Sequence, residues 1–463
     1  MRRDIRAAVL VFVSMASVLA AADKVIVSVS SLPDAKSTYP PSIADYRVLK
    51  RFQELHPEIE LRNAKEDERL PSEDSESALF RALQNGTAPD VIWLNFRLAD
   101  TYIQRGFLAP LDAYVAEMRV DELAERVPDV MKPVVHRAGA DGQQHWWAMP
   151  GELFVVMLQY RRDFFVKAGL DPDRPPGDWK QFKDYAMKVT NPRTEIYGTL
   201  FLDGEHVGWS LYPFLCSAGA QVMTRSPDEA WQMSFDSPEA VDAYEFAYDL
   251  AKTRVDKGAK SSPIVERSSV NGDYYREADT GIAMLFTYVT RDRLHDFDPK
   301  LIGIGLIPKG PTGKSSTEVN SRMLAIYARQ QDPKVRRAAW EWIRFVYSEE
   351  ARRVRVRTLV ELDAWRTTSA SVLKRFGFSE LARQIPEGRE KLFDQAVAQA
   401  TPEPYGRNAM EVYKYLSLPF DEMLRDSSLT PDMPKDKRRA RIQEILHKAV
   451  KRADEEMLGI KPE

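Results

Sequence analysis

The ten residues 85–94, NGTAPDVIWL, contain the end of one predicted helix and the whole of one predicted strand. Asn85-Gly86 is a typical helix stop, because asparagine and glycine adopt the left-handed backbone conformation there at little cost. Residues 90–94, DVIWL, form a short apolar run bounded by turn-forming residues, which is typical of a buried strand. A helix and a strand joined within a few residues are the basic unit of an α/β fold.

The residues before this segment repeat the same alternation. Residues 24–30, KVIVSVS, alternate β-branched with small polar side chains and predict a strand. Residues 43–55 carry apolar side chains at helical spacing and end at a His-Pro pair, where proline stops a helix. A second strand is predicted at 58–62 and a second helix at 75–84. Strands that alternate with helices in this way require right-handed crossovers, so the sequence predicts a mostly parallel sheet.

Later segments continue the α/β pattern. Residues 147–160 are apolar but are interrupted by Pro150-Gly151, which suits a chain that crosses between two domains. Further helices are predicted at 179–189, 237–252, 332–347 and 434–458, and further strands at 280–288 and 301–307.

The N-terminus has the pattern of a secretory signal peptide. Three arginines lie among the first six residues, and an apolar run of 13 residues, 7–19, follows them. This run is too short to span a bilayer comfortably, and the three alanines that end at Ala22 suit a cleavage site. An N-terminal membrane anchor is the alternative. Because no cysteine follows the run, the sequence excludes a lipid anchor and predicts a free periplasmic protein.

Composition excludes several classes of protein and site. The chain has 463 residues and a net charge of −3, from 66 basic and 69 acidic residues, so no basic field indicates nucleic-acid binding. Cys216 is the single cysteine, which excludes a disulfide framework. The six histidines show no spacing typical of a metal site, and we expect neither a metal nor a cofactor. The 20 Phe, 18 Tyr and 9 Trp supply many rings that could stack on a ligand.

No catalytic motif is found, and no catalytic residue is assigned. The chain has no Gly-x-Ser-x-Gly elbow. Residues 308–315, PKGPTGKS, superficially resemble a phosphate-binding loop, but proline occupies the position of the first glycine and removes a backbone donor. Carboxylates are abundant, so a glycosidase pair remains an alternative.

Seven segments together resemble one family. They are RFQELHPEIEL (51–61), NGTAPDVIWL (85–94), GFLAPLDAY (106–114), MPGELFVVMLQYRRDFFVKAGL (149–170), FDSPEAVDAYEFAY (235–248), GIAMLFTY (281–288) and AAWEWIRFVYS (338–348). Their order resembles that of the extracellular solute-binding proteins of sugar-type ABC importers, the maltose-binding-like class. The chain departs from the family at Tyr160-Arg161, where Tyr-Asn is common, and at DAWR (363–366), where many relatives have a proline-containing loop.

The resemblance implies a two-lobed, hinged periplasmic-binding-protein fold of the type II kind, α/β throughout, with mostly parallel central sheets. Lobe 1 would take residues 23–152 and 319–349, and lobe 2 residues 153–318 and 350–463. The implied function is a periplasmic receptor that captures a mono- to oligosaccharide in the cleft, closes on it and delivers it to an inner-membrane ABC permease. We therefore expect a monomer that is not an enzyme and binds no nucleic acid. The alternatives are a glycosidase-like periplasmic enzyme and the ligand-binding subunit of a sensor.

Sugar chemistry selects the candidate ligand-binding residues. A sugar ring stacks its C–H face on aromatic rings and bonds its hydroxyls to carboxylate, amide and guanidinium groups. The candidate rings are Trp93, Trp209, Tyr212, Tyr288 and Trp365, and the candidate polar groups are Ser31, Glu66, Asn95, Glu152, Asn320, Asp363 and Arg366. Trp209 and Tyr212 lie in a segment that lines the cleft in the family, as does Tyr288. Core packing is the alternative for Trp209 and Tyr288, and a solvated loop is the alternative for Glu66.

Overall fold

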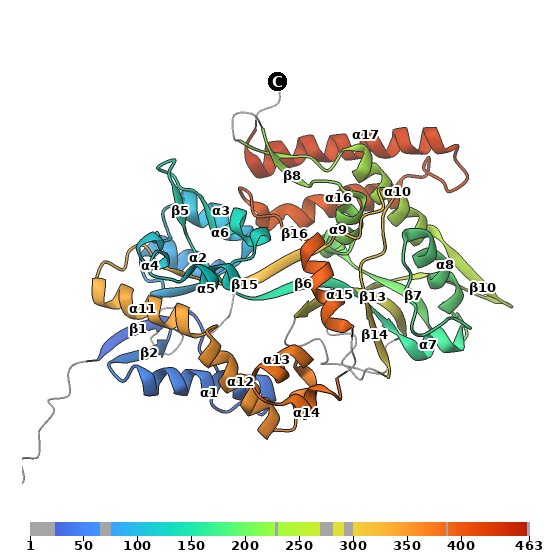
Figure 1. Ribbon diagram of the computed structural model, residues 1–463. Coiled ribbons are helices and arrows are strands. Elements are labelled where there is room, and N and C mark those ends of the chain that lie inside the picture. Colours follow the sequence, from blue (N-terminus) through green and yellow to red (C-terminus); the bar gives the residue numbers. More distant parts are fainter. Residues whose placement is uncertain are drawn as a thin grey trace, which may run out of the picture.

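A computed structural model describes residues 24–64, 76–226, 230–268, 281–290, 300–385 and 388–460. The predicted signal peptide, 1–22, and the candidate Glu66 lie outside these residues. The described part of the chain is built around one ten-stranded mixed sheet, with helices on both of its faces (Figure 1).

The sheet runs in the order β12-β7-β13-β6-β15-β3-β1-β2, with β14 paired to β6 and β16 paired to β15. Its strands are β1 (Val25–Val29), β2 (Ile59–Asn63), β3 (Val91–Leu94), β6 (Met149–Arg161), β7 (Tyr197–Leu202), β12 (Val265–Ser268), β13 (Ile282–Thr290), β14 (Ile302–Gly305), β15 (Glu318–Ile326) and β16 (Thr401–Pro402). Three hairpins lie outside it: β4 (His136–Ala138) with β5 (Gln144–Trp146), β8 (Met223–Arg225) with β9 (Trp231–Met233), and β10 (Arg254–Lys257) with β11 (Lys260–Pro263).

Two parallel half-sheets are joined by antiparallel strands. We call the half with β1, β2 and β3 lobe 1 and the half with β7, β12 and β13 lobe 2, and the neighbouring pairs within each half are parallel. β6 and β15 pair antiparallel with each other, and they also pair antiparallel with β13 and β3, respectively. The predicted fold class is confirmed, but the sheet is one mixed sheet rather than two mostly parallel ones. The sheet is mixed because β6 and β15, which carry the chain between the lobes, run antiparallel to their neighbours β13 and β3.

Helices cover both halves. Lobe 1 carries α1 (Pro40–Leu55), α2 (Glu76–Asn85), α3 (Phe96–Gln104), α4 (Asp112–Val115), α5 (Val120–Arg126), α6 (Lys132–Val135) and α11 (Pro333–Phe345). Lobe 2 carries α7 (Arg162–Lys167), α8 (Trp179–Val189), α9 (Val207–Ala218), α10 (Pro238–Lys252), α16 (Val412–Arg425) and α17 (Lys435–Ala453). Four more helices are α12 (Glu349–Glu361), α13 (Ala370–Arg375), α14 (Ser379–Ala382) and α15 (Arg389–Gln399); α12 lies beside α1, and α15 lies beside β6 (Figure 1).

Each lobe has its own hydrophobic core. The lobe 1 core includes Val27, Phe52 and Trp340, all fully buried. The lobe 2 core includes Phe214 and Phe420, which are also fully buried. Because burial of apolar area is the main source of stability, each half has the material of a separate folding unit.

Three of the predicted helices begin at a residue whose side chain caps them. The Asp178 carboxylate accepts a hydrogen bond from the Gln181 N–H (2.8 Å) at the start of α8. Ser237 and Asp332 cap α10 and α11 in the same way, and each is followed by a proline in the first turn. Local chemistry therefore accounts for these helix starts.

The close packing of α9 on α16 depends on Gly208. A Cβ at this position would lie 2.1 Å from the Tyr413 carbonyl oxygen, so only glycine lets the two backbones approach this far. The Gly208 N–H donates to the Ser417 hydroxyl (2.8 Å) across the same contact. This contact fixes the position of α16, which carries Tyr413, against α9.

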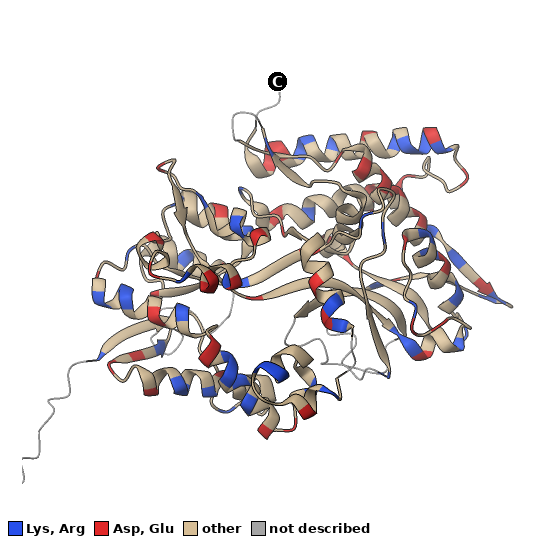
Figure 2. Cartoon of the chain, in the orientation of Figure 1, with Lys and Arg blue, Asp and Glu red and all other residues tan. Residues whose placement is uncertain are grey.

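The helices α12 and α15, which follow α11 in the sequence, pack in two different places. α12 lies along α1, and Arg355 of α12 forms an ion pair with Asp45 of α1 (2.6 Å). α15 instead packs Phe393 against Val155 and Val289 of the central sheet. Figure 2 shows acidic and basic segments interspersed over both lobes, with several basic positions on α12 and α13. The lobe boundaries given above remain a prediction.

In the described part of the chain, no helix combines the length and the apolar character needed to cross a membrane.

Candidate ligand-binding site

A group of buried and half-buried polar side chains lies where the two lobes meet. We call it the interlobe cluster, and its members are Arg97, Tyr288, Glu318, Asn320, Glu403 and Tyr413. Arg97 comes from α3 of lobe 1, whereas the tyrosines come from β13 and α16 of lobe 2. The other three members stand on the strand β15 or directly after β16. Both lobes and a connecting strand thus contribute to one site.

Strand pairing explains how these residues meet. Glu318 and Asn320 are two residues apart on β15, so their side chains leave the same face of the sheet. β16 runs parallel to β15 with Glu318 beside Thr401 and Val319 beside Pro402, and the Glu403 N–H donates to the Val319 carbonyl oxygen (2.9 Å). This register brings Glu403 next to Asn320, although 83 residues separate them in the sequence.

Two carboxyl groups form the centre of the cluster. Glu318 is 0% exposed and Glu403 is 2% exposed. The Tyr413 hydroxyl lies 3.0 Å from Glu318 Oε2 and 3.0 Å from Glu403 Oε1. Tyr288 donates to the other oxygen of Glu318, and Asn320 donates to the other oxygen of Glu403. Every carboxyl oxygen therefore has a polar partner, as buried carboxyl groups require.

Arg97 supplies the positive charge. Its Nε lies 3.0 Å from Glu403 Oε1, its guanidinium donates to the Met410 carbonyl oxygen (3.2 Å), and it covers the Tyr413 ring with 5.1 Å between guanidinium carbon and ring centre. These contacts reach from lobe 1 to lobe 2. They connect the lobes through a cation on one side and a carboxylate on the other.

Burial perturbs the protonation of the carboxyl pair. Loss of solvent raises the pKa of Glu318 well above its usual range, and the nearby charge of Glu403 raises it further. Burial also raises the pKa of Glu403, although Arg97 opposes this rise. Burial first, and then the nearby carboxylates, raise the pKa of Tyr413 well above its usual range. Two close buried carboxyl groups hold a proton more readily than either would alone.

Aromatic rings border the cluster. The Trp209 and Tyr288 rings are 5.7 Å apart at 48°, and Trp209 is partly exposed. The Tyr212 ring meets the Tyr413 ring edge to face at 6.0 Å, and its hydroxyl donates to the Pro402 carbonyl oxygen (3.4 Å). Rings beside bidentate polar groups are the components that bind sugars.

A second set of contacts joins the lobes beside the cluster. Arg137 is paired with Asp100 in lobe 1 and donates to the Tyr405 carbonyl oxygen (3.1 Å). The Trp231 indole N–H donates to the same Asp100 carboxylate (3.2 Å). The lobes are therefore in direct contact on this side of the sheet.

Five of the predicted ligand residues lie in or beside the cluster. Tyr288 and Asn320 are members, and Trp209 and Tyr212 border it. Asn95 caps α3, where its side chain accepts from the Arg97 N–H (3.0 Å) and donates to Glu76 (2.9 Å). Its position therefore fixes the start of the helix that carries Arg97.

The structure does not bring the other predicted residues to the cluster. Trp365 is 4% exposed in a small core of α12 to α14, where its indole N–H donates to Asp363 (3.0 Å) and Arg366 covers its ring at 4.3 Å. Ser31 is exposed after β1, and Trp93 is 40% exposed on β3.

Four cluster members were not among the sequence candidates: Arg97, Glu318, Glu403 and Tyr413. Glu403 stands in TPEP (401–404), a proline-containing stretch, whereas the resemblance to the family predicts such a loop at 363–366. That stretch was a usable signal. Nothing local marks Glu318 as a buried acid, because its strand neighbours are an ordinary mixture of polar and apolar residues.

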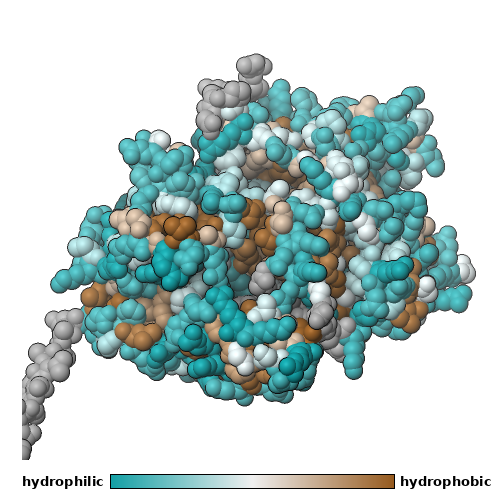
Figure 3. Space-filling view, in the orientation of Figure 1, coloured by the Kyte–Doolittle hydropathy of each residue, from teal (hydrophilic) through white to brown (hydrophobic). Residues whose placement is uncertain are grey.

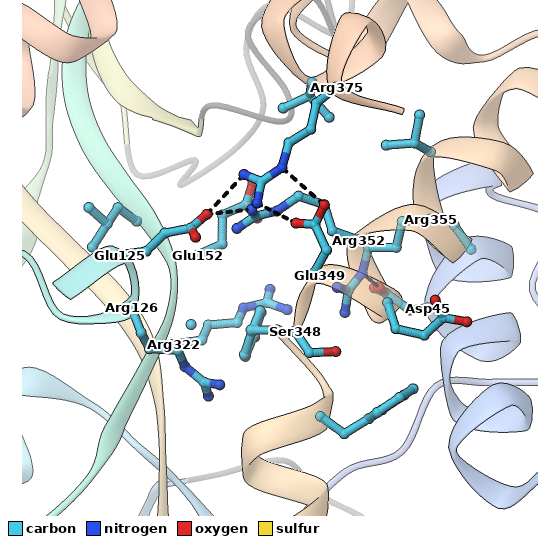
Figure 4. A pocket seen from close by; sticks show the side chains of 18 of the residues that line it. Asp45, Glu125, Arg126, Glu152, Arg322, Ser348, Glu349, Arg352, Arg355 and Arg375 are labelled. Atoms are coloured by element: carbon cyan, nitrogen blue, oxygen red, sulfur yellow. Dashed lines mark hydrogen bonds and ion pairs between the residues drawn. The ribbon is translucent and has the colours of Figure 1, made fainter. Parts of the chain in front are cut away.

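A cavity of about 1070 Å³ lies on the side of the sheet that carries α15, and we call it the hinge cavity. Gly151 to Phe154 of β6 and Arg322 of β15 line its inner wall, so the predicted Glu152 lies here. The face in Figure 3 is hollowed near its centre, and Figure 4 shows the charged lining. Glu125 pairs with Arg352 (2.9 Å) and with Arg375 (3.0 Å), which also reaches Glu349.

Arg126 forms part of this wall and joins three segments of lobe 1 at the hinge. It donates to the carbonyl oxygens of Pro150 (2.9 Å), Arg344 (3.1 Å) and Ile343 (2.6 Å). Burial lowers the pKa of Arg126 to about 10. The last two carbonyls end α11, where the helix dipole favours a cation. The side chain thus ties the start of β6 to the end of α11.

The interlobe cluster is the better candidate for a ligand site. Charged groups are largely paired with one another in both places, so pairing does not separate the hinge cavity from the interlobe cluster. The interlobe cluster combines rings and hydrogen-bonding groups from both lobes, which is what a solute enclosed between them would require.

A family model for bacterial extracellular solute-binding proteins matches residues 32–353. The chain belongs to this family. A maltotriose-binding protein of Pyrococcus abyssi is 24% identical over 179 residues, which is 38% of this chain and 34% of that protein. YcjN of Escherichia coli, a putative ABC transporter periplasmic-binding protein, is 27% identical over 173 residues, or 37% and 36% of the two chains. The alignments thus span about a third of each of these relatives.

Solved structures of solute-binding proteins share the fold over nearly the whole chain. The GacH receptor of Streptomyces glaucescens, solved unliganded and with acarbose, has a TM-score of 0.63 and 18% identity, and the match covers 92% of this chain and 98% of GacH. A solute-binding protein of Thermotoga lettingae bound to α-D-tagatose has a TM-score of 0.60 and 21% identity, with coverage of 92% and 100%. At these identities the likeness establishes the two-lobed fold.

Proposed function

We propose that this solute-binding protein captures a carbohydrate between its lobes and delivers it to an ABC permease of the inner membrane. The observation that carries the proposal is the interlobe cluster, in which Arg97 of one lobe meets Glu403 and Tyr413 of the other. A solute bound there would contact both lobes and would favour the conformation in which they are close. Differential affinity for the two conformations is what drives closure.

The side chains in and beside the cluster would have different roles in binding the sugar. Trp209, partly exposed beside Tyr288, would stack on the apolar face of a sugar ring. Asn320 and Arg97 would bond its hydroxyls, because amide and guanidinium groups make directional bonds to them. Of the twelve candidate residues, we propose as ligand contacts the five that lie in or beside the cluster, Asn95, Trp209, Tyr212, Tyr288 and Asn320. The names of the relatives, a maltotriose-binding protein among them, support a carbohydrate ligand.

The receptor would act outside the inner membrane as a monomer. Its family is extracellular by description, and the predicted signal peptide would release it into the periplasm without a lipid anchor. Its partner would be the permease, which reads the closed form. The protein would release its ligand unchanged, as a receptor rather than an enzyme does.

A thermal-shift screen tests the proposal. Mono-, di- and oligosaccharides, polyols and amino acids are added to the purified protein. A ligand at 100 times its dissociation constant stabilises the folded state by roughly 2.7 kcal/mol, which is a clear shift. Mass spectrometry of the released ligand then distinguishes a receptor from a glycosidase. If no carbohydrate or polyol shifts the unfolding temperature, the proposal is wrong.

A single variant locates the site. Trp209→Ala should weaken binding by about tenfold or more while the protein stays folded, because it removes the stacking ring. Tyr39→Ala is the control, since Tyr39 is 38% exposed just before α1 and is neither a member of the cluster nor one of its bordering rings. Equal affinity of Trp209→Ala and wild type would remove Trp209 from the site.

A further inference from the structure

The charges of the interlobe cluster do not balance. Glu318 and Glu403 are both buried, and Arg97 is the single cation among the described residues that contact them. Glu76 adds a further carboxylate close to Arg97 and Glu403. A buried excess of negative charge is costly, so it is removed either by a proton or by a cation from outside.

Counting hydrogen-bond donors places a proton in the pair. Tyr413 has one hydroxyl proton, yet its oxygen lies 3.0 Å from an oxygen of each carboxyl group. It can donate to one of them, so the other carboxyl group must be protonated and donate to Tyr413. Arg97 and Asn320 both bond Glu403, which favours Glu403 as the ionised member. The proton therefore belongs to Glu318, in agreement with the raised pKa of its carboxyl group.

Among the residues that the structure describes, the surroundings of Glu318 offer no other charge to replace this proton. The titratable groups that face it or its partners are Glu403 after β16, Tyr413 of α16, Tyr288 of β13, Tyr212 and Cys216 of α9, Arg97 of α3 and Glu76 of α2. Apart from Arg97 these groups are neutral or acidic. The described part of the junction therefore carries an excess of acidic groups.

An independent observation points to a ligand at this face. Thr290 is 6% exposed, and its hydroxyl has no hydrogen-bond partner among the described residues. It is two residues after Tyr288 on β13, and the strand register places it across Phe154 from Asn320. It therefore shares a face with the cluster. An unpartnered buried hydroxyl is unfavourable in the empty protein and becomes favourable when a polar solute bonds it.

We propose that the solute of this receptor is a carbohydrate that carries a protonated amine, and that its ammonium group replaces the proton on Glu318. The step is balanced: Glu318–COOH and R–NH3⁺ become the ion pair Glu318–COO⁻ with R–NH3⁺, and one proton passes to solvent. This inference rests on the proposed function, because it gives the chemical class of the solute for the same site. A neutral sugar has no charge with which to displace the proton.

Calorimetry with matched probes tests the proposal on the full-length mature protein. The probes are glucosamine, galactosamine and the glucosamine disaccharide, each beside its N-acetylated form, which keeps the ring and removes the charge. Titrations in two buffers of different ionisation enthalpy count the protons released. We expect at least one aminated probe to bind tenfold or more tightly than its N-acetylated form and to release about one proton. Its Kd should fall about tenfold per pH unit while free Glu318 keeps its proton.

Variants separate the charge effect from damage to the fold. Glu318→Gln keeps the shape of the protonated carboxyl group but cannot ionise, so it should abolish proton release and reduce the preference for the amine at least tenfold. The matched control is Glu245→Gln, which changes another buried glutamate, paired with Arg438 on α17. The control should retain proton release. The two-buffer measurement on the wild type decides the question even if a variant does not fold.

The outcomes distinguish failure of the aminated-sugar proposal from failure of the proposed carbohydrate receptor. Binding of neutral or N-acetylated sugars with equal or higher affinity, and without proton release, would overturn this inference and leave the carbohydrate receptor intact. Failure of all carbohydrates, aminated and neutral, would overturn both. Amine binding with proton release that Glu318→Gln leaves unchanged would move the exchanging proton elsewhere, and the assignment to Glu318 would be wrong.

Discussion

Replacing Glu318 by glutamine should change how stability depends on pH. Burial and the neighbouring Glu403 raise the pKa of Glu318 in the folded protein, whereas the unfolded chain has the usual glutamate value. Below that value both states are protonated, and the carboxyl group contributes no difference. As the pH rises above it, the unfolded chain releases the proton and the folded protein keeps it. The folded state therefore loses stability with rising pH until Glu318 itself ionises.

The size of the effect follows from this linkage. Each pH unit over which only the unfolded chain ionises costs the folded state about 1.4 kcal/mol. The wild type should lose stability through Glu318 at up to this rate for as long as the folded protein keeps the proton. Glutamine pays no such penalty. Its extra amide N–H, which lacks an acceptor beside Tyr413, adds a cost of about 1–3 kcal/mol that is the same at every pH.

The assay compares chemical unfolding of the wild type and Glu318→Gln at pH 5, 6 and 7. As the pH rises, the free energy of unfolding of Glu318→Gln should increase relative to that of the wild type by about 1.4 kcal/mol per pH unit. Glu245→Gln is the control and should lose stability, because it leaves Arg438 and Arg439 without their shared carboxylate. If the difference in free energy of unfolding between Glu318→Gln and the wild type stays constant with pH, Glu318 is ionised in the folded protein. The assignment of a proton to Glu318 would then be refuted.

Three further predictions concern packing and the hinge. Gly208→Ala should destabilise the protein by about 2–3 kcal/mol in thermal unfolding, because the new Cβ would meet the Tyr413 carbonyl oxygen at 2.1 Å, whereas Gly177→Ala, with 3.6 Å to a flexible glutamine, should be tolerated. Arg126→Met should lower the free energy of unfolding in urea by about 3 kcal/mol, because it leaves three carbonyl oxygens without their donor. Arg174→Met, at an exposed site, is the control and should change it very little. Equal losses in the two variants would contradict the role of Arg126. Arg97→Gln should separate the lobes and enlarge the radius of gyration in small-angle scattering, and an unchanged profile would contradict the proposed junction.

Much of the fold could be predicted from local patterns. The strand expected at 90–94 is β3 (Val91–Leu94), and the helix expected at 179–189 is α8 with the predicted cap at Asp178. These elements depend on the spacing of apolar residues and on capping residues, which lie close together in the sequence. α9 was not predicted as a helix, because Pro213 and the apolar residues around it hide the helical period.

The candidate site could be predicted only in part. Trp209, Tyr212 and Tyr288 are candidates because their segments resemble those that line the cleft in the family, and all three lie in or beside the interlobe cluster. The stretch at 363–366 was chosen for its position in the sequence, but helices α12 to α14 place it in a core of their own beside α1. A motif that is displaced along the chain cannot be recognised from its spacing to other motifs.

The sequence by itself determined the α/β class, the order of most elements and the family, because each of these is written in short-range periodicity and ordered motifs. Only the tertiary structure decided which charges meet. Glu318 and Glu403 are ordinary acids in the sequence, and they become a coupled pair because β16 pairs with β15 in one register and α16 places Tyr413 between them. Protonation depends on burial and on neighbours a few ångströms away, and both are properties of the folded chain.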